Sequence, residues 1–432
     1  NENADVVGLS GLITPSLEEM VQVASEMKRR GLKIPLLIGG ATTSVIHTAV
    51  KIAPDYNQPV IHVRDASKVT GVLAKLFSPS EREKFVNEVR TSYERMREEH
   101  FGRQKKKQYI SLKKARENRF KPDWKTTDIS KPKFIGTKYF EDYPLEKLRP
   151  YIDWTFFFHA WKLNGKYPAI FDDPVKGEEA KKIYDDAQEM LDKIVSEKWL
   201  RAKGVIGIYP AYAVGDSVEV FSAKNKKLAD FHFLRNEGKK EAGTPNLCLS
   251  DFIAPKETGL TDYIGFFAVT TGLGIEEHIK AFEANNDDYG AIMLKVMADR
   301  LAEAFTERLH ERVRKEFWGY ATNEKLNVQK ILSEKYRGIR PAPGYPACPE
   351  HSEKRTIFDL LNVEEKAGIR LTENYAMYPA ASVSGYYFAH PQAQYFNVGR
   401  LLPDQLEDYA RRKGLSLEKV KILLNMNIVE NE

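Results

Sequence analysis

The chain has 432 residues, of which 42% are apolar and 29% are charged, and its formal net charge is +5. This length holds two or three domains with sizeable cores, and the composition is that of an ordinary globular protein. No apolar run approaches the roughly 20 residues of a membrane span, and the first residues lack the pattern of a signal peptide. Two cysteines cannot build a disulfide framework, so we expect a cytoplasmic protein.

Three short apolar runs open the sequence, at Val6–Leu9, Ile34–Ile38 and Pro59–Val63. Continuous apolar runs separated by helical patterns are typical of buried parallel strands joined by crossover helices. A doubly wound domain of this kind normally contains about five strands, and only three are found here. We therefore expect residues 1–95 to be the C-terminal part of an incomplete, flavodoxin-like α/β domain, with the chain beginning inside it.

Small or polar residues follow each of these runs: Ser10 with Thr14, Gly39 with Gly40, and Ala66. The carboxyl ends of parallel strands share one edge of the sheet, where small residues let a bulky ligand approach the backbone. We expect a ligand edge here. The alternative is that these residues only form tight turns.

A basic, poorly periodic segment comes next and includes Lys105–Lys107 and Lys113–Lys114. A block of like charges is typical of a solvated linker, so we assign residues 96–122 to a linker. Nucleic-acid binding is the alternative, but no recognition motif accompanies these residues, and we expect no nucleic-acid partner.

Residues 123–432 have a different character, because the alternation of strands and helices stops. Strands are predicted near 204–209, 217–222, 228–234 and 263–270. This pattern favours a larger α+β domain with an antiparallel sheet and long helices.

The clearest helix of this second part spans about 291–317 and carries a continuous apolar stripe, which we assign to the core. Asp299 and Glu303 are four residues apart, so their carboxylates point the same way. Either they pair with Lys295 and Arg300 on a solvated face, or they line a ligand site.

The segment from Arg340 to Cys348, with the following Pro349, contains four prolines and one glycine. Such a segment cannot be helix interior or central strand, and a stiff loop loses little entropy on binding. Arg340 offers a planar fork for a carboxylate, and Tyr345 offers a π face for a cation or a flat heterocycle. We expect either a cradle for a zwitterionic, positively charged, aromatic-bearing small molecule or a rigid connector whose arginine pairs with a glutamate.

Aromatic residues are dense between Glu373 and Phe396, where we expect a strand, a turn and a strand. Tyr395 and Phe396 would then point to opposite faces of the last strand. No phosphate-binding loop, nucleophile elbow or metalloprotease motif occurs in the sequence, and Cys348 with His351 falls short of a zinc ligand set. We therefore expect no catalytic side chain and no metal site.

Four stretches carry a resemblance to a known family. They read SGLITPS from Ser10, IGGATTS from Ile38, YIDWT from Tyr151 and GIRPAPGYPACPEH from Gly338. These stretches resemble the C-terminal half of cobalamin-dependent methionine synthase, over essentially the whole chain. The resemblance implies that residues 1–95 end a cobalamin-binding domain and that residues 123–432 form a reactivation domain that binds S-adenosylmethionine.

Enzymes of this family are methyltransferases of methionine biosynthesis, which move a methyl group from methyltetrahydrofolate through cobalamin to homocysteine. The resemblance implies that this portion supports reductive remethylation of oxidised cob(II)alamin. S-adenosylmethionine would supply the methyl group, and a flavodoxin-type partner would supply the electron. The remaining domains of the parent enzyme would be further partners.

The resemblance also implies two sets of site residues. The S-adenosylmethionine site would contain Asp153, Glu303, Arg340, Ala342, Tyr345, Tyr395 and Phe396, and the cobalamin contacts would be Ser10, Thr14, Gly39, Gly40 and Ala66. Arg340 suits the methionyl carboxylate and Asp153 or Glu303 the ammonium, whereas Tyr345 or Tyr395 suits the adenine or the sulfonium.

One motif of the family is missing. Its lower cobalt ligand is a histidine in an Asp-x-His-x-x-Gly motif, and the only Asp-x-His here, Asp230 to His232, has Arg235 in place of the glycine. We therefore expect cobalamin to bind this chain weakly or not at all, and the homocysteine, folate and zinc sites to lie in other segments of the enzyme. Two alternatives remain: a non-catalytic docking and conformational-control domain for a redox partner, and a corrinoid carrier of another methyltransferase.

Overall fold

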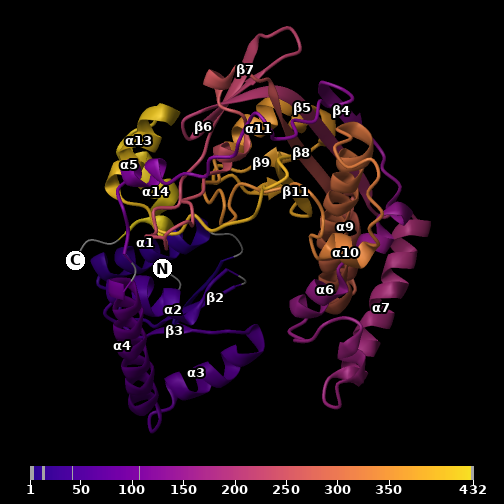
Figure 1. The fold of residues 1–432 in the computed structure, drawn as a ribbon. Coiled ribbons are helices and arrows are strands. Elements are labelled where there is room, and N and C mark those ends of the chain that lie inside the picture. Colours follow the sequence, from indigo (N-terminus) through magenta and orange to yellow (C-terminus); the bar gives the residue numbers. More distant parts are fainter. Residues whose placement is uncertain (1–3, 12–14, 41, 107, 430–432) are drawn as a thin grey trace. The chain divides into compact units, whose positions relative to one another are not determined.

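The structure is a computed structural model that describes residues 4–11, 15–40, 42–106 and 108–429. The chain divides into two compact units on either side of the bond between Ile110 and Ser111 (Figure 1). The segment expected to be a linker is largely helical. Helix α4 (Arg82–Lys106) belongs to the first unit, and α5 (Leu112–Glu117) belongs to the second because Leu112 and Ala115 are buried there.

The first unit is built on a parallel sheet, as predicted. Strands β1 (Val7–Ser10), β2 (Leu36–Gly39) and β3 (Val60–His62) lie in the order β1-β2-β3. The connecting elements are α1 (Pro15–Arg29), α2 (Val45–His47), a π-helical turn (Thr48–Ile52), two 3₁₀ turns (Ala53–Asp55 and Ala66–Lys68) and α3 (Val69–Phe77).

Both faces of this sheet are covered. Leu36 and Ile38 pack against Met20 of α1 on one face, whereas Leu37 packs against Leu76 of α3 on the other. Because neighbouring residues of β2 are buried on opposite faces, the strand reads as a continuous apolar run instead of an alternating one.

The second unit is built on an antiparallel sheet in the order β11-β8-β5-β6-β7, in which β4 also pairs with β5. Its strands are β4 (Gly136–Phe140), β5 (Arg201–Val214), β6 (Ser217–Phe221), β7 (Lys227–His232), β8 (Asp262–Leu273) and β11 (Ser382–Tyr387). A small separate pair consists of β9 (Arg370–Leu371) and β10 (Met377–Tyr378). The predicted α+β class with an antiparallel sheet is confirmed.

The helices of this unit are α5, α6 (Trp154–Ala160), α7 (Gly177–Ser196), α8 (Ile275–Ala284), α9 (Asp288–Arg312), α10 (Val328–Leu332), α11 (Glu353–Leu361), α12 (Val363–Ala367), α13 (Pro403–Lys413) and α14 (Leu417–Leu424). A π-helical turn (Val313–Phe317) prolongs α9, and single 3₁₀ turns lie at Leu145–Lys147, Arg149–Tyr151, Ala169–Asp172, Leu249–Phe252, Lys256–Thr258 and Asn425–Asn427. Within the described ranges, no helix is both long and apolar enough to cross a membrane.

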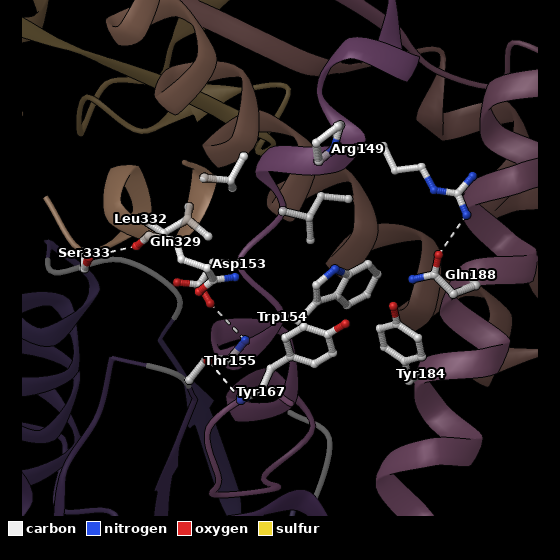
Figure 2. A pocket seen from close by; sticks show the side chains of 13 residues that line it. Arg149, Asp153, Trp154, Thr155, Tyr167, Tyr184, Gln188, Gln329, Leu332 and Ser333 are labelled. Carbon is white, nitrogen blue, oxygen red and sulfur yellow. Dashed lines mark hydrogen bonds between the residues drawn. The ribbon is translucent and has the colours of Figure 1, made fainter. Parts of the chain in front are cut away.

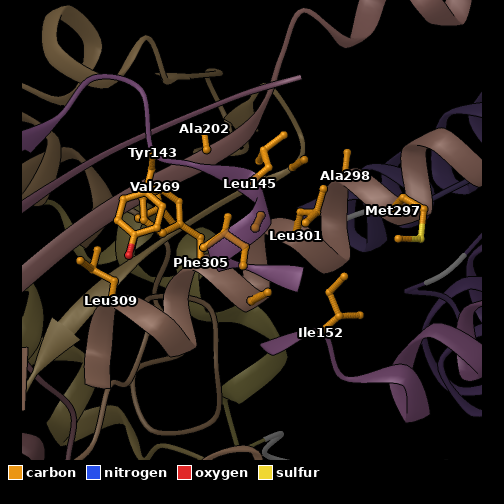
Figure 3. Packing of buried hydrophobic residues seen from close by; sticks show 14 of the residues in the cluster. Tyr143, Leu145, Ile152, Ala202, Val269, Met297, Ala298, Leu301, Phe305 and Leu309 are labelled. Carbon is orange, nitrogen blue, oxygen red and sulfur yellow. The ribbon is translucent and has the colours of Figure 1, made fainter. Parts of the chain in front are cut away.

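The sheet of the second unit is covered on both faces by helices. Ile206 of β5 joins the core that contains Leu301 and Phe305 of α9, whereas the adjacent Val205 joins the core that contains Phe358 of α11. Figure 3 shows the first of these cores, where the ring of Phe305 lies 4.6 Å from that of Tyr143 between centroids. The predicted apolar stripe of α9 is therefore core.

Candidate ligand-binding site

The proline-rich segment from Arg340 to Cys348 forms a closed loop beside β11, the edge strand of the sheet. The amide of Tyr386 donates to the carbonyl of Pro341 at 2.9 Å, which ties the loop to β11. Within the loop, the amide of Gly344 donates to the carbonyl of Cys348 at 2.8 Å, and the Cys348 thiol donates to the carbonyl of Ala342 at 2.9 Å. The loop is therefore rigid without being helix or strand.

Arg340 is held from two sides. Its backbone amide donates to the Tyr395 hydroxyl at 3.0 Å, and its Nη2 donates to Oε1 of Glu307 on α9 in an ion pair. Burial raises the pKa of Glu307, and the charge of Arg340 opposes this rise. Arg340 thus pairs with a glutamate, as one of the two alternatives predicted, and its side chain keeps 15% of its area exposed.

Further titratable groups surround Arg340. Tyr345 and Tyr395 are 57% and 39% exposed, so both rings are accessible. Desolvation and the Glu303 carboxylate raise the pKa of Tyr345, and Arg340 lowers it, which places these two charges near its ring. The structure thus brings together Glu303, Arg340, Ala342, Tyr345 and Tyr395 from α9, the loop and the segment after β11.

The expected pairing of the α9 carboxylates is absent. Among the residues that the structure describes, neither Asp299 with Lys295 nor Glu303 with Arg300 forms an ion pair. Asp299 is exposed, whereas Glu303 is partly buried beside the loop.

The segment around Tyr395 and Phe396 is not the strand that we expected. A turn closes there, because the Ala393 amide donates to the His390 carbonyl at 3.0 Å, and residues 391–400 form no strand. The two side chains nevertheless face opposite ways, since Tyr395 is exposed and Phe396 packs against the core beneath β11. Phe396 therefore belongs to the packing of the second unit.

Asp153 lies in a separate pocket of about 480 Å³ (Figure 2). It caps α6, where its carboxylate accepts from the Thr155 amide at 2.9 Å. The rings of Tyr167 and Tyr184 stack in the same pocket at 5.7 Å between centroids. Ser333, at the end of α10, lines the pocket and precedes Glu334, whose charge reaches Tyr395 and Glu307. The segment of Ser333 and Glu334 thus links the pocket to the surroundings of the loop.

The first unit brings together the small residues at the carboxyl edge of its sheet. Ser10 pairs in register with Gly39, and the carboxyl end of β3 leads to Ala66 at the same edge. Gly40 has a φ of +106°, and a Cβ there would lie 2.3 Å from the carbonyl oxygen of Gly11. Thr14 lies outside the described residues. Gly40 therefore lets two backbone segments of the chain approach each other closely, as the tight-turn alternative predicts.

Two comparisons with known proteins point to one family. The family model for the activation domain of vitamin B12-dependent methionine synthase matches residues 144–414. A crystal structure of the MetH reactivation domain bound to AdoHcy is 50% identical, with a TM-score of 0.73, over 75% of this chain and 99% of that chain. This chain belongs to the methionine synthase activation-domain family. The resemblance noted in the sequence is confirmed.

The activation-domain match includes every candidate of the S-adenosylmethionine site, from Asp153 to Phe396, and none of the candidates at the edge of β1–β3. It assigns the second unit to the reactivation of methionine synthase.

Three residues beside Arg340 were missed by sequence reasoning, namely Glu307, Glu334 and Tyr336. Glu307 follows Glu303 by one helical turn, so the spacing of the α9 carboxylates was the signal that would have found it.

Proposed function

We propose that the second unit binds S-adenosylmethionine and presents its methyl group to a cobalamin held by an adjoining domain. One observation carries this proposal: an arginine fixed in a stiff loop, with two exposed tyrosine rings beside it. The 50%-identical relative supports it, because AdoHcy is S-adenosylmethionine without the transferable methyl group.

The residues present fit such a ligand. Arg340 would bind the carboxylate, and Glu303 or Asp153 would bind the ammonium. Tyr345 and Tyr395 would stack on the adenine or face the sulfonium. Phe396 and the Ala342 backbone would hold the loop against the ligand.

Methyl transfer from S-adenosylmethionine depends on the positioning of the donor more than on acid-base catalysis. S-adenosylmethionine supplies a methyl group that its sulfonium already activates, so no side chain has to donate or remove a proton. In the described part of the chain, no group of three or more His, Cys, Asp and Glu side chains is arranged to hold a metal ion. The residues of this chain would bind, orient and shield the donor.

We further propose that Ser10, Thr14, Gly39, Gly40 and Ala66 contact the cobalamin, and that a flavodoxin-type protein donates the electron. The positive net charge of the chain suits an acidic partner. The whole enzyme would transfer methyl groups from methyltetrahydrofolate to homocysteine. Two buried free thiols, Cys248 and Cys348, are consistent with a reducing cytoplasm.

Calorimetric titration of the 432-residue chain with S-adenosylmethionine tests the proposal. We expect saturable binding that Arg340→Ala weakens by about 10- to 100-fold, the effect of losing one hydrogen bond to a charged group. The matched control is Arg355→Ala, which removes an exposed arginine that pairs with Glu364. A folded protein that does not bind S-adenosylmethionine would leave only the docking alternative.

A further inference from the structure

Unpartnered polar atoms cluster behind Arg340. Six buried side-chain atoms there have no hydrogen-bond partner among the described residues: Glu307 Oε2, His310 Nδ1, Arg314 Nη1, Tyr336 Oη, Arg340 Nε and Tyr387 Oη. The His310 ring lies 4.9 Å from that of Tyr336 and 5.1 Å from that of Tyr387 between centroids. Buried polar atoms are normally paired with protein groups or ordered water, so these six atoms keep hydrogen-bonding capacity that the protein itself does not use.

The nitrogens of the Arg340 guanidinium have different surroundings, some within this cluster and one toward the proposed ligand site. Nη2 donates to Oε1 of Glu307, and Nε is buried. Nη1 makes no hydrogen bond to another described residue, and the Arg340 side chain keeps 15% of its area exposed. Glu307 therefore holds Nη2, and with Nε buried, Nη1 is the guanidinium nitrogen left for a ligand.

We propose that Glu307 is a positioning residue that aims Nη1 of Arg340 at the ligand's carboxylate and takes up a proton from solvent when that carboxylate binds. The inference rests on the proposed function, since it concerns the same S-adenosylmethionine site. The proton would form an O–H bond on Oε2, the carboxylate oxygen that has no partner.

The proton uptake follows from the charges around Glu307. The cation that supports its buried carboxylate is Arg340, and burial already raises its pKa. A ligand carboxylate bound to the same guanidinium adds a second negative charge near Glu307 and competes for the positive charge of Arg340. Its binding therefore raises the pKa of Glu307 further.

The histidine and tyrosine side chains that face Glu307 do not replace it as the proton acceptor. Glu303 and Glu334 add negative charge and favour its protonation. Burial, with Arg314 and Arg340, lowers the pKa of His310 far below its usual range, so this ring stays neutral. Burial raises the pKa values of Tyr336, Tyr387 and Tyr395, so these hydroxyls stay protonated.

Calorimetry with S-adenosylmethionine, in buffers of different ionisation enthalpy, measures the protons taken up per ligand bound. We expect net uptake by the wild type and a smaller value in Glu307→Gln, which keeps an oxygen to accept from Nη2 but cannot titrate. The affinity of Glu307→Gln should stay within about threefold of wild type, and Glu307→Ala should bind about tenfold more weakly because Arg340 loses its anchor.

The matched control is Glu311→Gln, on the same helix. Its carboxylate pairs with Arg308 and accepts from the Tyr151 hydroxyl instead of touching Arg340. This variant should keep the wild-type affinity and proton uptake. Comparing its proton number with that of Glu307→Gln also corrects for titration of the ligand's own ammonium. Equal proton numbers in Glu307→Gln and Glu311→Gln would overturn the inference, as would wild-type affinity in Glu307→Ala. A wild type that does not bind S-adenosylmethionine would instead overturn the proposed function.

Discussion

Gly344 stands at the tip of the loop from Arg340 to Cys348, with a φ of +100°. A Cβ at this position would lie 2.3 Å from Cε1 of His351. The ring cannot easily move away, because the Lys354 ammonium donates to its Nδ1 at 2.7 Å. The shape of the loop therefore depends on a residue without a side chain.

Gly344→Ala is predicted to lower the free energy of unfolding by about 1–3 kcal/mol, through backbone strain and the contact with His351. Gly243→Ala separates the two causes, because Gly243 has a φ of +85° but no atom within 4 Å of the added carbon. We expect the larger loss at Gly344 in urea denaturation. Equal losses would mean that the contact with His351 contributes nothing.

Arg340 makes a structural ion pair and is also the proposed carboxylate clamp. An ion pair with a neighbouring glutamate and a carboxylate clamp were alternatives in the sequence; the ion pair occupies Nη2, and the proposed clamp would use Nη1. Nη2 is bound to Glu307, whereas Nη1 makes no hydrogen bond to another described residue. A planar guanidinium can serve both sides because its donors are fixed in a fork.

At the scale of elements, α9 combines the core and the candidate site. Leu301 and Phe305 are fully buried in the core, whereas Glu303 and Glu307 lie toward the loop that contains Arg340. Because the helix is fixed by its apolar stripe, the two carboxylates are held in place without the help of a ligand.

Leu301→Ala is predicted to cost about 2–5 kcal/mol of stability, since it opens a cavity in the main core. Ile292→Ala, on the same helix but 49% exposed, should change stability by less than about 0.5 kcal/mol. Chemical denaturation of both variants checks this. A small loss at Leu301 would contradict the assignment of the stripe to the core.

At the scale of the whole molecule, the two proposed ligands belong to different units. The edge of β1–β3 lies in the first unit, and Arg340 lies in the second. The methyl donor and its acceptor would thus be bound by separate folds, and methyl transfer would require an arrangement of the domains that brings them together.

The chain is predicted to bind cob(II)alamin weakly and without a protein histidine on the cobalt, because the Asp-x-His-x-x-Gly motif of the family is missing. Electron paramagnetic resonance of cob(II)alamin with ¹⁵N-histidine-labelled protein checks this. We expect the nitrogen splitting to be the same with labelled and unlabelled protein. A splitting that changes on labelling, in a tight complex, would contradict the prediction.

Local patterns in the sequence predicted the parallel strands of the first unit, most strands of the antiparallel sheet and the long helix α9. The continuous apolar runs predicted the parallel strands β1 to β3, and the helical stripe predicted α9, because burial imposes a period that the sequence must follow. The prolines of residues 340–348 determined a stiff loop, since they exclude both helix and sheet. The family of the chain could be recognised from four short stretches.

Only the tertiary structure decided which side chains meet. The pairing of Arg340 with Glu307, the position of Glu334 and the separate pocket around Asp153 depend on contacts between segments far apart in the chain, which no local period encodes. The expected strand after His390 is absent for the same reason. The hydrogen bond there closes a turn instead of pairing the segment with a neighbouring strand. Residue types and spacing fix the local elements, whereas packing of one element on another determines the site.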